Sequence, residues 1–320
     1  MSTLLAVRDL SKTYPTPGGT VRALDRVSLT LNRGEVLGIV GESGCGKSTL
    51  GRAILRLIEP SSGEVLFDGT DLTSLNRREL KERRRDLQIV FQDPFGSLNP
   101  RHKVGAIIRE PLDVHRIGTR RDRAKRVLDL LEMVGLPAEA ADRYPHQFSG
   151  GQRQRIAIAR ALALEPKLIV ADEPVSALDV SIQSQIINLI ADLRARLGLS
   201  ILFISHDLSV VRHVSDRIAV MYLGRVVETG AVSDVMDDPA HPYTQALLSA
   251  IPRPSATGRR ERIVLQGELP DPANPPSGCA FRTRCPHAMP QCATEFPALV
   301  PRRKDATVRE AACHLYEPVS

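Results

Sequence analysis

Apolar and polar positions follow two different periods along this chain, and the period predicts the element. In the amino-terminal part, alternating apolar residues with intervening turns at 32–34 and 68–69 are typical of strands. A continuous apolar run at 36–40 indicates a buried parallel strand, and residues 48–57 after it have the pattern of a helix. The alternating runs predict strands over 4–7, 27–31 and 63–67.

Residues 105–145 change character, because charged residues mix with apolar ones at helical spacing. The apolar positions of this pattern are Val127, Leu128, Leu131 and Val134. We expect a helical subdomain, inserted into the sheet domain over about 105–150.

From residue 152 the alternation of helices and strands returns. An amphipathic helix is predicted by the three–four spacing of Ile182, Ile186, Leu189, Ile190, Leu193 and Leu197. The other predicted elements are a helix at 152–164, strands at 168–171 and 200–204, and a hairpin at 217–227 that turns at 223–225. The fold class is therefore α/β.

After Ile251 the composition shifts, because prolines at six positions break any long element. They are Pro252, Pro254, Pro270, Pro272, Pro275 and Pro276. A small cysteine-bearing tail follows. We therefore expect one large domain over 1–250 and a carboxy-terminal extension over 251–320, which suits a chain of 320 residues.

Amino-acid composition and charge exclude few functions for this chain. Hydrophobic residues make up 42% of the chain, whereas aromatic residues make up 4% and tryptophan is absent, which argues against a stacking surface for single-stranded nucleic acid. The net charge of +6 suits a nucleotide, an anionic membrane face or nucleic acid alike. The charge run at 77–86 predicts a solvated helix face rather than a nucleic-acid patch.

The chain offers no sign of a membrane span or a leader. No run of about 18 apolar residues occurs, so we expect no membrane-spanning segment. Residues 1–9 lack the basic start and the long apolar stretch of a signal peptide. We expect a cytosolic chain whose five cysteines are reduced or metal-bound.

The strand at 36–40 leads directly into a glycine-rich segment that fits the phosphate-loop pattern G-x-x-x-x-G-K-[ST]. Glycines allow backbone N–H groups to approach phosphate, and the amino terminus of the next helix favours anions. We expect Lys47 to reach the β- and γ-phosphates and Ser48 to bind Mg²⁺. The predicted nucleotide contacts are Gly41, Glu42, Ser43, Gly44, Cys45, Gly46, Lys47, Ser48 and Thr49.

Polar side chains follow three other predicted strands. Asp172 and Glu173 end the run at 168–171, where Asp172 is placed to hold the magnesium shell and Glu173 to polarise an attacking water. Gln92 follows an apolar run and can ligate Mg²⁺ or orient water, and His206 ends the strand at 200–204, which favours a contact to the γ-phosphate.

A second glycine-rich run, Ser149, Gly150, Gly151 and Gln152, opens a helix. A serine hydroxyl and a bare helix amino terminus make another anion site. One chain does not easily fold both sites around one γ-phosphate, so we expect a second copy or a partner to supply the second site.

These motifs resemble those of ABC-transporter ATPase subunits, in the order that this family shows. Residues 41–48 are similar to its Walker A motif, 149–152 to its signature motif and 168–173 to its Walker B motif. Gln92 matches the Q-loop, 176–179 the D-loop and His206 the switch histidine, and the aromatic residue that stacks on adenine maps to Tyr14. The resemblance implies a P-loop NTPase core with an antiparallel β subdomain and an inserted helical subdomain.

A closer resemblance is to the dipeptide and oligopeptide importer branch, carried by 91–101, 144–148 and the segment that begins at 241–244. The form of the Q-loop resembles the F-type subunit of the two paired ATPases. The resemblance implies an ATPase at the cytoplasmic face of the inner membrane, energising import of peptides or related small solutes. The implied partners are a second ATPase subunit, different or identical, two transmembrane permeases and, indirectly, an extracytoplasmic solute-binding protein.

Four cysteines of the tail have the spacing C-x5-C-x6-C-x20-C, namely Cys279, Cys285, Cys292 and Cys313. Structural zinc usually prefers a tight C-x2-4-C pair, which is missing here, and a cubane cluster suits wider spacing because each thiolate reaches a different iron. The importer branch carries a [4Fe-4S] cluster on similarly spaced cysteines, so the resemblance implies that cluster in a structural role. Zinc and unligated thiols are the alternatives.

Two other functions stay open at this point. A soluble ABC-family ATPase that acts on nucleic acid or ribosomes would typically carry coiled-coil, zinc or tandem ATPase insertions, and none is visible in the sequence. A small-molecule phosphotransferase shares the phosphate loop, but the signature and D-loop motifs argue against it.

Overall fold

The computed structural model describes residues 2–17, 19–93, 95–250, 263, 270–304 and 307–316. The chain divides into two compact units. The first unit consists of Met1–Ser2, Asn32–Glu35 and Ser74–Ile204, and the second of Thr3–Leu31, Val36–Thr73 and Ser205–Ser320.

The first unit contains three neighbouring parallel strands, β6, β7 and β8, in that order. Leu87 lies opposite Leu168, and Asp172 lies opposite Ile204, so the carboxyl ends of β7 and β8 are level with each other. Both of these strands are buried along their whole length, as their continuous apolar sequence predicts. The strands are β6 (Leu87–Val90), β7 (Leu168–Asp172) and β8 (Ser200–Ile204).

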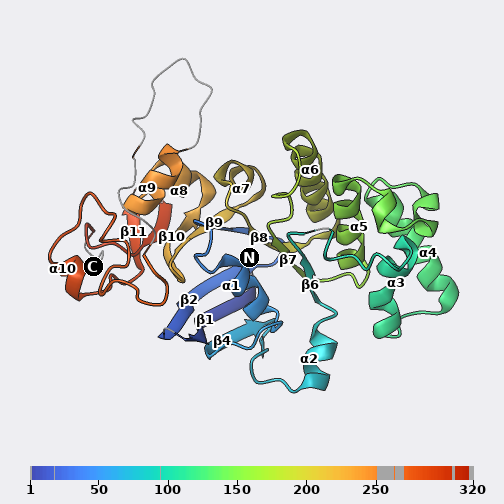
Figure 1. Cartoon of the computed structure of the whole chain (residues 1–320), viewed down its shortest axis with the longest axis horizontal. Coiled ribbons are helices and arrows are strands. Elements are labelled where there is room, and N and C mark those ends of the chain that lie inside the picture. Colours follow the sequence, from blue (N-terminus) through green and yellow to red (C-terminus); the bar gives the residue numbers. More distant parts are fainter. Residues whose placement is uncertain are drawn as a thin grey trace, which may run out of the picture. The chain divides into compact units, whose positions relative to one another are not determined.

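Five α-helices lie in the described part of the first unit, and three of them, α3, α4 and α5, pack on one another (Figure 1). The inserted segment is helical, as predicted. The helices are α2 (Arg77–Arg83), α3 (Val104–Val114), α4 (Arg120–Met133), α5 (Gly150–Leu162) and α6 (Val180–Leu197), and the 3₁₀ turns Ala138–Asp142 and Pro145–Gln147 lie between α4 and α5.

Three details of the helix predictions were wrong. Leu128 is 45% exposed, and the buried face of α4 is formed by Val127, Leu130 and Leu131 with the following Val134, because that set keeps the three–four helical period. Leu197, the last residue of α6, is 44% exposed. Helix α5 begins at Gly150 rather than at residue 152.

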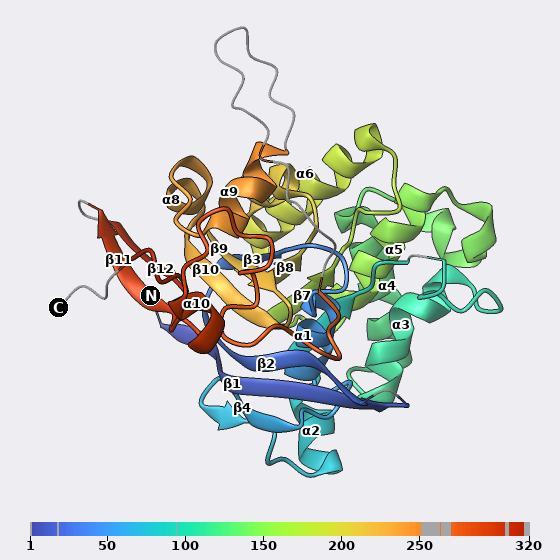
Figure 2. The same ribbon diagram turned by 60° about the vertical axis from the view of Figure 1, so that its left-hand side comes forward.

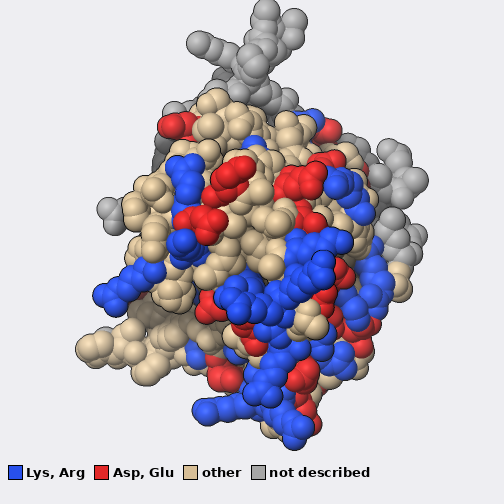
Figure 3. All heavy atoms as spheres, turned by 90° about the vertical axis from the view of Figure 1, so that its right-hand side faces the viewer, with Lys and Arg blue, Asp and Glu red and all other residues tan. Residues whose placement is uncertain are grey.

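The charge run at 77–86 lies on and after α2, where Leu80 is the buried residue of the helix. The helix begins with a capping box in which Asn76 accepts from the backbone and Glu79 reaches back to the Asn76 N–H. On the side of the molecule that carries α3 and α4, Lys and Arg are interspersed with Asp and Glu (Figure 3). The prediction of a solvated helix face is confirmed.

The second unit contains an antiparallel sheet with the strand order β2, β1, β4, β5, in which Leu5 lies opposite Phe67. In a second set of strands, β3 pairs in parallel with β9, and β9, β10, β12 and β11 continue as antiparallel neighbours (Figure 2). The strands are β1 (Thr3–Thr16), β2 (Gly19–Asn32), β3 (Val36–Val40), β4 (Ser62–Phe67), β5 (Thr70–Asp71), β9 (Arg217–Tyr222), β10 (Arg225–Ala231), β11 (Val300–Lys304) and β12 (Thr307–Ala311).

The predicted hairpin is present as β9 and β10, with the turn at Leu223 and Gly224. The proline-rich tail, for which no long element is predicted, adds the hairpin of β11 and β12 to the edge of β10. The helices of this unit are α1 (Lys47–Ile54), α7 (Leu208–Val214), α8 (Val232–Asp237), α9 (Pro242–Ser249) and α10 (Gln291–Thr294).

Strand β3 is buried at all five positions, which makes it a rigid support for the loop that follows it. Helix α7 packs closely on this strand, and a Cβ atom at Gly38 would collide with Val211 and Ser215. Within the described part of the chain, no helix has both the length and the apolar character needed to cross a membrane.

Candidate functional site

The phosphate loop connects β3 to α1 in the second unit and closes around its own lysine. Lys47 is 4% exposed, and its Nζ donates to the carbonyl oxygens of Gly41 at 2.8 Å and Glu42 at 2.9 Å. Gly41 and Gly46 have φ angles of 152° and 104°, and a Cβ on either would collide with a backbone carbonyl, of Met221 or Ala23 respectively. Glycine is therefore required at both positions to give this concave loop.

Helix α1 begins at the end of this loop, and its N-cap is Gly46, which has no side chain with which to cap the first turn. Backbone N–H groups of the first turn are consequently available to an anion, as is usual for phosphate loops. Cys45 is buried, and burial raises the pKa of its thiol, so this cysteine is a packing residue rather than a nucleophile.

Two other predicted nucleotide residues lie in the second unit. Tyr14 is on β1, is 37% exposed, and has the Lys12 ammonium 5.0 Å from its ring centroid. His206 is exposed in a turn whose neighbour Ser205 donates its backbone N–H to Ile39 at 3.0 Å. This bond ties the turn to β3, the strand that leads into the phosphate loop.

The first unit brings Gln92, Asp172 and Glu173 together. Asp172 ends β7 and is 1% exposed, whereas Glu173 leaves the strand with a φ of 47° and donates its N–H to Ile204 at 3.0 Å. Gln92 Nε2 donates to Glu173 Oε2 at 3.1 Å. A positive φ on a non-glycine residue is costly and is concentrated at functional sites, so this backbone conformation directs the Glu173 carboxylate toward the Gln92 amide.

The second glycine-rich run forms the amino terminus of α5, but its own side chains cap it. Ser149 Oγ accepts from the Gln152 N–H at 3.4 Å, and Gln152 Oε1 accepts from the Ser149 N–H at 3.1 Å. The glycines also serve packing, because a Cβ on Gly151 would collide with Ile182 of α6. The N–H groups of Gly150 and Gly151 are the part of this helix end that can face an anion.

The four tail cysteines, which are far apart in sequence, line one small pocket in the second unit together with His241 and Phe281. The Cys279 N–H donates to the Cys292 carbonyl at 2.8 Å, and burial raises the pKa of Cys313 to about 11. Burial also raises the pKa of Cys279 and Cys285. Within the described ranges, no group of three or more His, Cys, Asp and Glu side chains is arranged to hold a metal ion.

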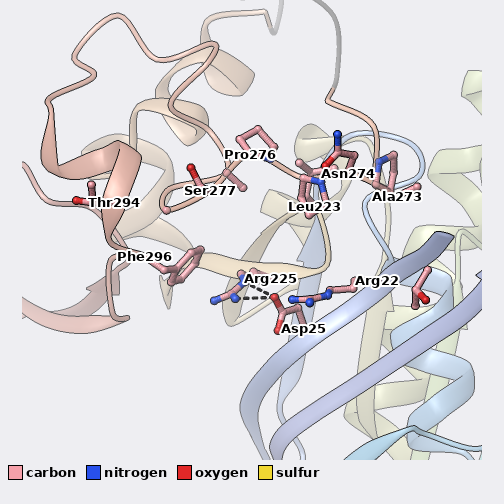
Figure 4. Close-up of a pocket in the computed structure, with 15 residues that line it drawn as sticks. Arg22, Asp25, Leu223, Arg225, Ala273, Asn274, Pro276, Ser277, Thr294 and Phe296 are labelled. Carbon is pink, nitrogen blue, oxygen red and sulfur yellow. Dashed lines mark hydrogen bonds and ion pairs between the residues drawn. The ribbon is translucent and has the colours of Figure 1, made fainter. Parts of the chain in front are cut away.

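Two residues that the sequence analysis did not identify contact the phosphate loop, namely Tyr243 of α9 and Arg284 of the extension. Only proximity in the fold reveals them, because both lie about 200 residues or more from the loop along the chain. A larger cavity of about 620 Å³ separates the extension from β2 and the β9–β10 turn (Figure 4). There Arg225 pairs with Asp25 at 2.9 Å, and Phe296 lies against the Arg225 guanidinium.

Comparison with protein families gives two matches along the chain. Residues 24–176 match the ABC transporter family, and residues 227–292 match the family described as oligopeptide/dipeptide transporter, C-terminal region. The second match covers the region of α9 and reaches the third of the tail cysteines.

Curated relatives extend over nearly the whole chain. A putative peptide import ATP-binding protein of Brucella ovis is 57% identical over 296 residues, which cover 92% of this chain and 93% of that protein. The oligopeptide transport ATP-binding protein AppF of Bacillus subtilis is 54% identical over 324 residues, with 98% of each chain covered.

Solved structures match the cassette portion. A dimeric post-hydrolysis state of the ATP-binding cassette MJ0796, bound to ADP and Pi, has a TM-score of 0.66 and 35% identity, and the match covers 72% of this chain and 99% of that one. CbiO1 of Clostridium perfringens, part of an ABC transporter complex, has a TM-score of 0.66 and 33% identity, with 74% and 92% covered. The α/β P-loop class predicted from the sequence is confirmed by these matches.

Proposed function

This chain belongs to the ABC transporter ATP-binding family, and on that premise we propose that it is the ATP-hydrolysing subunit of an importer of peptides or related small solutes. The single observation that carries the proposal is the phosphate loop closed around Lys47, in a chain that matches an oligopeptide transport ATP-binding protein over 98% of its length. The extension-family match over 227–292 supports the peptide branch over other ABC proteins.

Lys47, the loop N–H groups and Tyr14 bind ATP, with Tyr14 under the adenine. Ser48, Gln92 and Asp172 offer hydroxyl, amide and carboxylate oxygens, which is the ligand chemistry that Mg²⁺ prefers. Mg²⁺ supplies charge neutralisation on the phosphates. Glu173 accepts a proton from the attacking water, Gln92 orients the Glu173 carboxylate through their hydrogen bond, and His206 contacts the γ-phosphate.

The signature residues Ser149, Gly150, Gly151 and Gln152 serve the ATP of a second ATPase subunit. Their helix end carries no lysine of its own, and part of its N–H capacity is used by the capping box. The dimeric state described for the matched cassette supports an arrangement in which two subunits complete each other's sites.

The four cysteines hold a [4Fe-4S] cluster in a structural role. Support comes from their convergence on one pocket, and from the donor set, because each iron of such a cluster takes one thiolate and the four sulfur atoms need not meet at one point. The spacing of the cysteines, which lacks a tight C-x2-4-C pair, favours the cluster over a single zinc ion. Iron and acid-labile sulfide analysis of the purified chain tests this assignment, and stoichiometric zinc without iron contradicts it.

We assign residues 1–250 to the ATP-binding domain, with the helical insertion at about 105–150, and residues 251–320 to the importer extension. The chain is peripheral at the cytoplasmic face of the membrane, as the F-type member of an ATPase pair bound to two permeases. The similarity to proteins named as peptide import and oligopeptide transport ATP-binding proteins favours this assignment over a nucleic-acid ATPase.

The test of the function is ATP hydrolysis by the full-length chain without a phosphate acceptor, combined with a pull-down from detergent-solubilised membranes. We expect slow hydrolysis by the chain alone and recovery of integral membrane permeases. Phosphate transfer that requires a small-molecule acceptor would establish a phosphotransferase instead. Recovery of nucleic acid or ribosomes without a permease would establish the soluble alternative.

A further inference from the structure

Two residues from outside the phosphate loop hold its second residue, Glu42. Arg284 donates from Nη1 and Nη2 to the two carboxylate oxygens of Glu42 at 2.8 and 3.1 Å. The hydroxyl of Tyr243 accepts the Glu42 backbone N–H at 2.8 Å. The Arg284 side chain is 8% exposed, so solvent and salt screen this two-bond ion pair little. Glu42 is thus fixed through both its side chain and its backbone.

Both contacts to Glu42 come from residues that adjoin the lining of the four-cysteine pocket. Arg284 immediately precedes Cys285, and Tyr243 donates its N–H to Nδ1 of His241 at 3.1 Å. Cys285 and His241 both line the pocket. Cys285 is therefore connected to Glu42 through Arg284, and His241 is connected to Glu42 through Tyr243.

Packed aromatic rings make this connection stiff. The Tyr243 ring lies 4.7 Å from that of Tyr222 and 5.5 Å from that of Phe281, and the Tyr222 and Phe281 rings meet edge to face at 5.3 Å. All three side chains are essentially fully buried. Phe281 also lines the cysteine pocket, so the same rigid group contacts the pocket on one side and supports the loop anchor on the other.

We propose that Arg284 is a positioning residue for the phosphate loop. Through Arg284, the packing of the residues that line the four-cysteine pocket sets how tightly the loop binds nucleotide. The inference rests on the proposed function of this loop as the ATP site. Arg284 neutralises the Glu42 carboxylate, which belongs to the proposed phosphate-binding loop and would otherwise add an unpaired negative charge there. Because binding linkage is reciprocal, nucleotide in the loop also stabilises the packing around the cysteine pocket.

The chain offers two matched controls. Arg212 of α7, in the same unit, also holds a carboxylate, but its partner is Asp237 at 3.1 Å and it does not line the cysteine pocket. Phe296 lies against the Arg225 guanidinium, which pairs with Asp25 (Figure 4), and does not touch Glu42. Arg212→Gln therefore removes a guanidinium, and Phe296→Ala removes an aromatic contact of the extension, without uncovering the Glu42 carboxylate.

The experiment measures the Kd of a fluorescent Mg-ATP analogue for the full-length chain. For Arg284→Gln we expect a Kd about tenfold weaker, with a change of less than about twofold in the hydrolysis rate at saturating ATP, and for Arg284→Lys a partial recovery. Both control variants keep Kd within about twofold of the unmodified chain. An unchanged Kd in Arg284→Gln, or an equal loss in the controls, overturns the positioning role.

A double variant separates charge neutralisation from packing. Glu42→Gln on the Arg284→Gln background removes the uncovered carboxylate, so we expect most of the lost affinity to return. A double variant that binds as weakly as Arg284→Gln overturns the electrostatic argument. Thermal unfolding of each variant distinguishes a lost fold from a lost affinity, and Glu42→Gln alone tests the same pair with the Arg284 charge still present.

The cysteine pocket is tested on both backgrounds. Cys285→Ser is expected to weaken nucleotide binding about fivefold in the otherwise unmodified chain. It should have little further effect in Glu42→Gln/Arg284→Gln, where the ion pair between Arg284 and Glu42 is already absent. An equal effect on the two backgrounds overturns the coupling. Lys47→Ala, measured alongside, tests the proposed ATP site. Retained nucleotide binding in Lys47→Ala overturns the ATP site itself. Lost binding in Lys47→Ala together with normal binding in Arg284→Gln overturns only the positioning role of Arg284.

Discussion

The phosphate loop and the second glycine-rich run both lead into helices, but the first leaves the N–H groups of its helix without a side-chain cap and the second caps them. At α1 the N-cap is Gly46, and a lysine from the first turn folds back into the loop. At α5 the N-cap is Ser149, whose side chain and that of Gln152 cap the helix from within. The first end holds a lysine of its own inside the loop, whereas the second is capped by its own neutral side chains.

The two helix ends also differ in what supports them. The phosphate loop is held by residues from distant parts of the chain, Tyr243 and Arg284, whereas the α5 terminus is held by residues three positions apart and by close packing on α6. Local support forms with the helix itself, while distant support depends on the folded extension.

The largest effect is expected at Glu173, in the unit that carries the second helix end. Glu173→Gln keeps an oxygen that can accept from Gln92 but removes the base, so ATP hydrolysis should fall about 10²–10⁴-fold while ATP binding is retained. A steady-state phosphate-release assay with a parallel binding titration measures both. Glu165→Gln, an exposed glutamate of the same unit, is the control, and hydrolysis by Glu173→Gln at the unmodified rate contradicts the assignment.

The next effect is expected at Lys47, where affinity rather than rate should change. Lys47→Ala removes the ammonium that the loop carbonyls hold. If that ammonium binds the phosphates as proposed, the affinity for Mg-ATP should fall about 100-fold. Isothermal titration of the chain against Mg-ATP measures it, with the exposed Lys81→Ala as the control. Comparable binding by Lys47→Ala and Lys81→Ala would show that the Lys47 ammonium does not contribute to nucleotide affinity.

The distant support of the loop should be sensitive to pH through His241. Burial lowers the pKa of His241 to about 3, so in the window from 6.5 down to about 3 the unfolded chain binds more protons than the folded chain. This contribution to stability is complete above pH 6.5 and is lost as the pH falls, by at most about 1.4 kcal/mol for each pH unit.

Urea unfolding at pH 7.5 and pH 5.5 measures this effect. His241→Asn keeps a side chain that can accept the Tyr243 N–H and lacks the titrating ring, so its stability should fall less between the two pH values. Glu228 accepts the His241 backbone N–H, and burial raises the pKa of Glu228. Its effect on stability as the pH falls is opposite to that of His241, but it is the same in both proteins. Equal acid sensitivity of the two proteins would exclude His241 as the titrating group.

The smallest effect is expected at the locally supported helix end. Ser149→Ala removes the cap of α5 and should cost about 1 kcal/mol of unfolding free energy. If the signature residues serve a partner's ATP, this variant binds Mg-ATP normally as a single chain and loses hydrolysis in the assembled complex. Weaker ATP binding by the isolated variant chain would show that this end acts on the chain's own nucleotide.

Sequence patterns predicted the local parts of this molecule well. The strand before the phosphate loop, the strands at 168–171 and 200–204, and the β9–β10 hairpin all follow from the apolar period and turn residues of a few consecutive positions. The apolar face of α4 was assigned less well, because a run of adjacent apolar residues does not say which of Leu128 and Leu130 faces inward until the neighbouring helices are in place. The tail strands β11 and β12 were missed, because prolines and charged residues mask them and pairing with β10 stabilises them.

By itself the sequence determined the motif chemistry of this ATPase, because a phosphate loop needs glycines, a lysine and a hydroxyl within eight consecutive residues after a strand. The tertiary structure alone decided that Glu42 meets Arg284, 242 residues further along the chain, and that four dispersed cysteines line one pocket. The physical reason is that short-range spacing constrains only neighbours in a turn, helix or strand. Contacts across hundreds of residues arise when buried surfaces such as the Tyr222, Tyr243 and Phe281 group pack together.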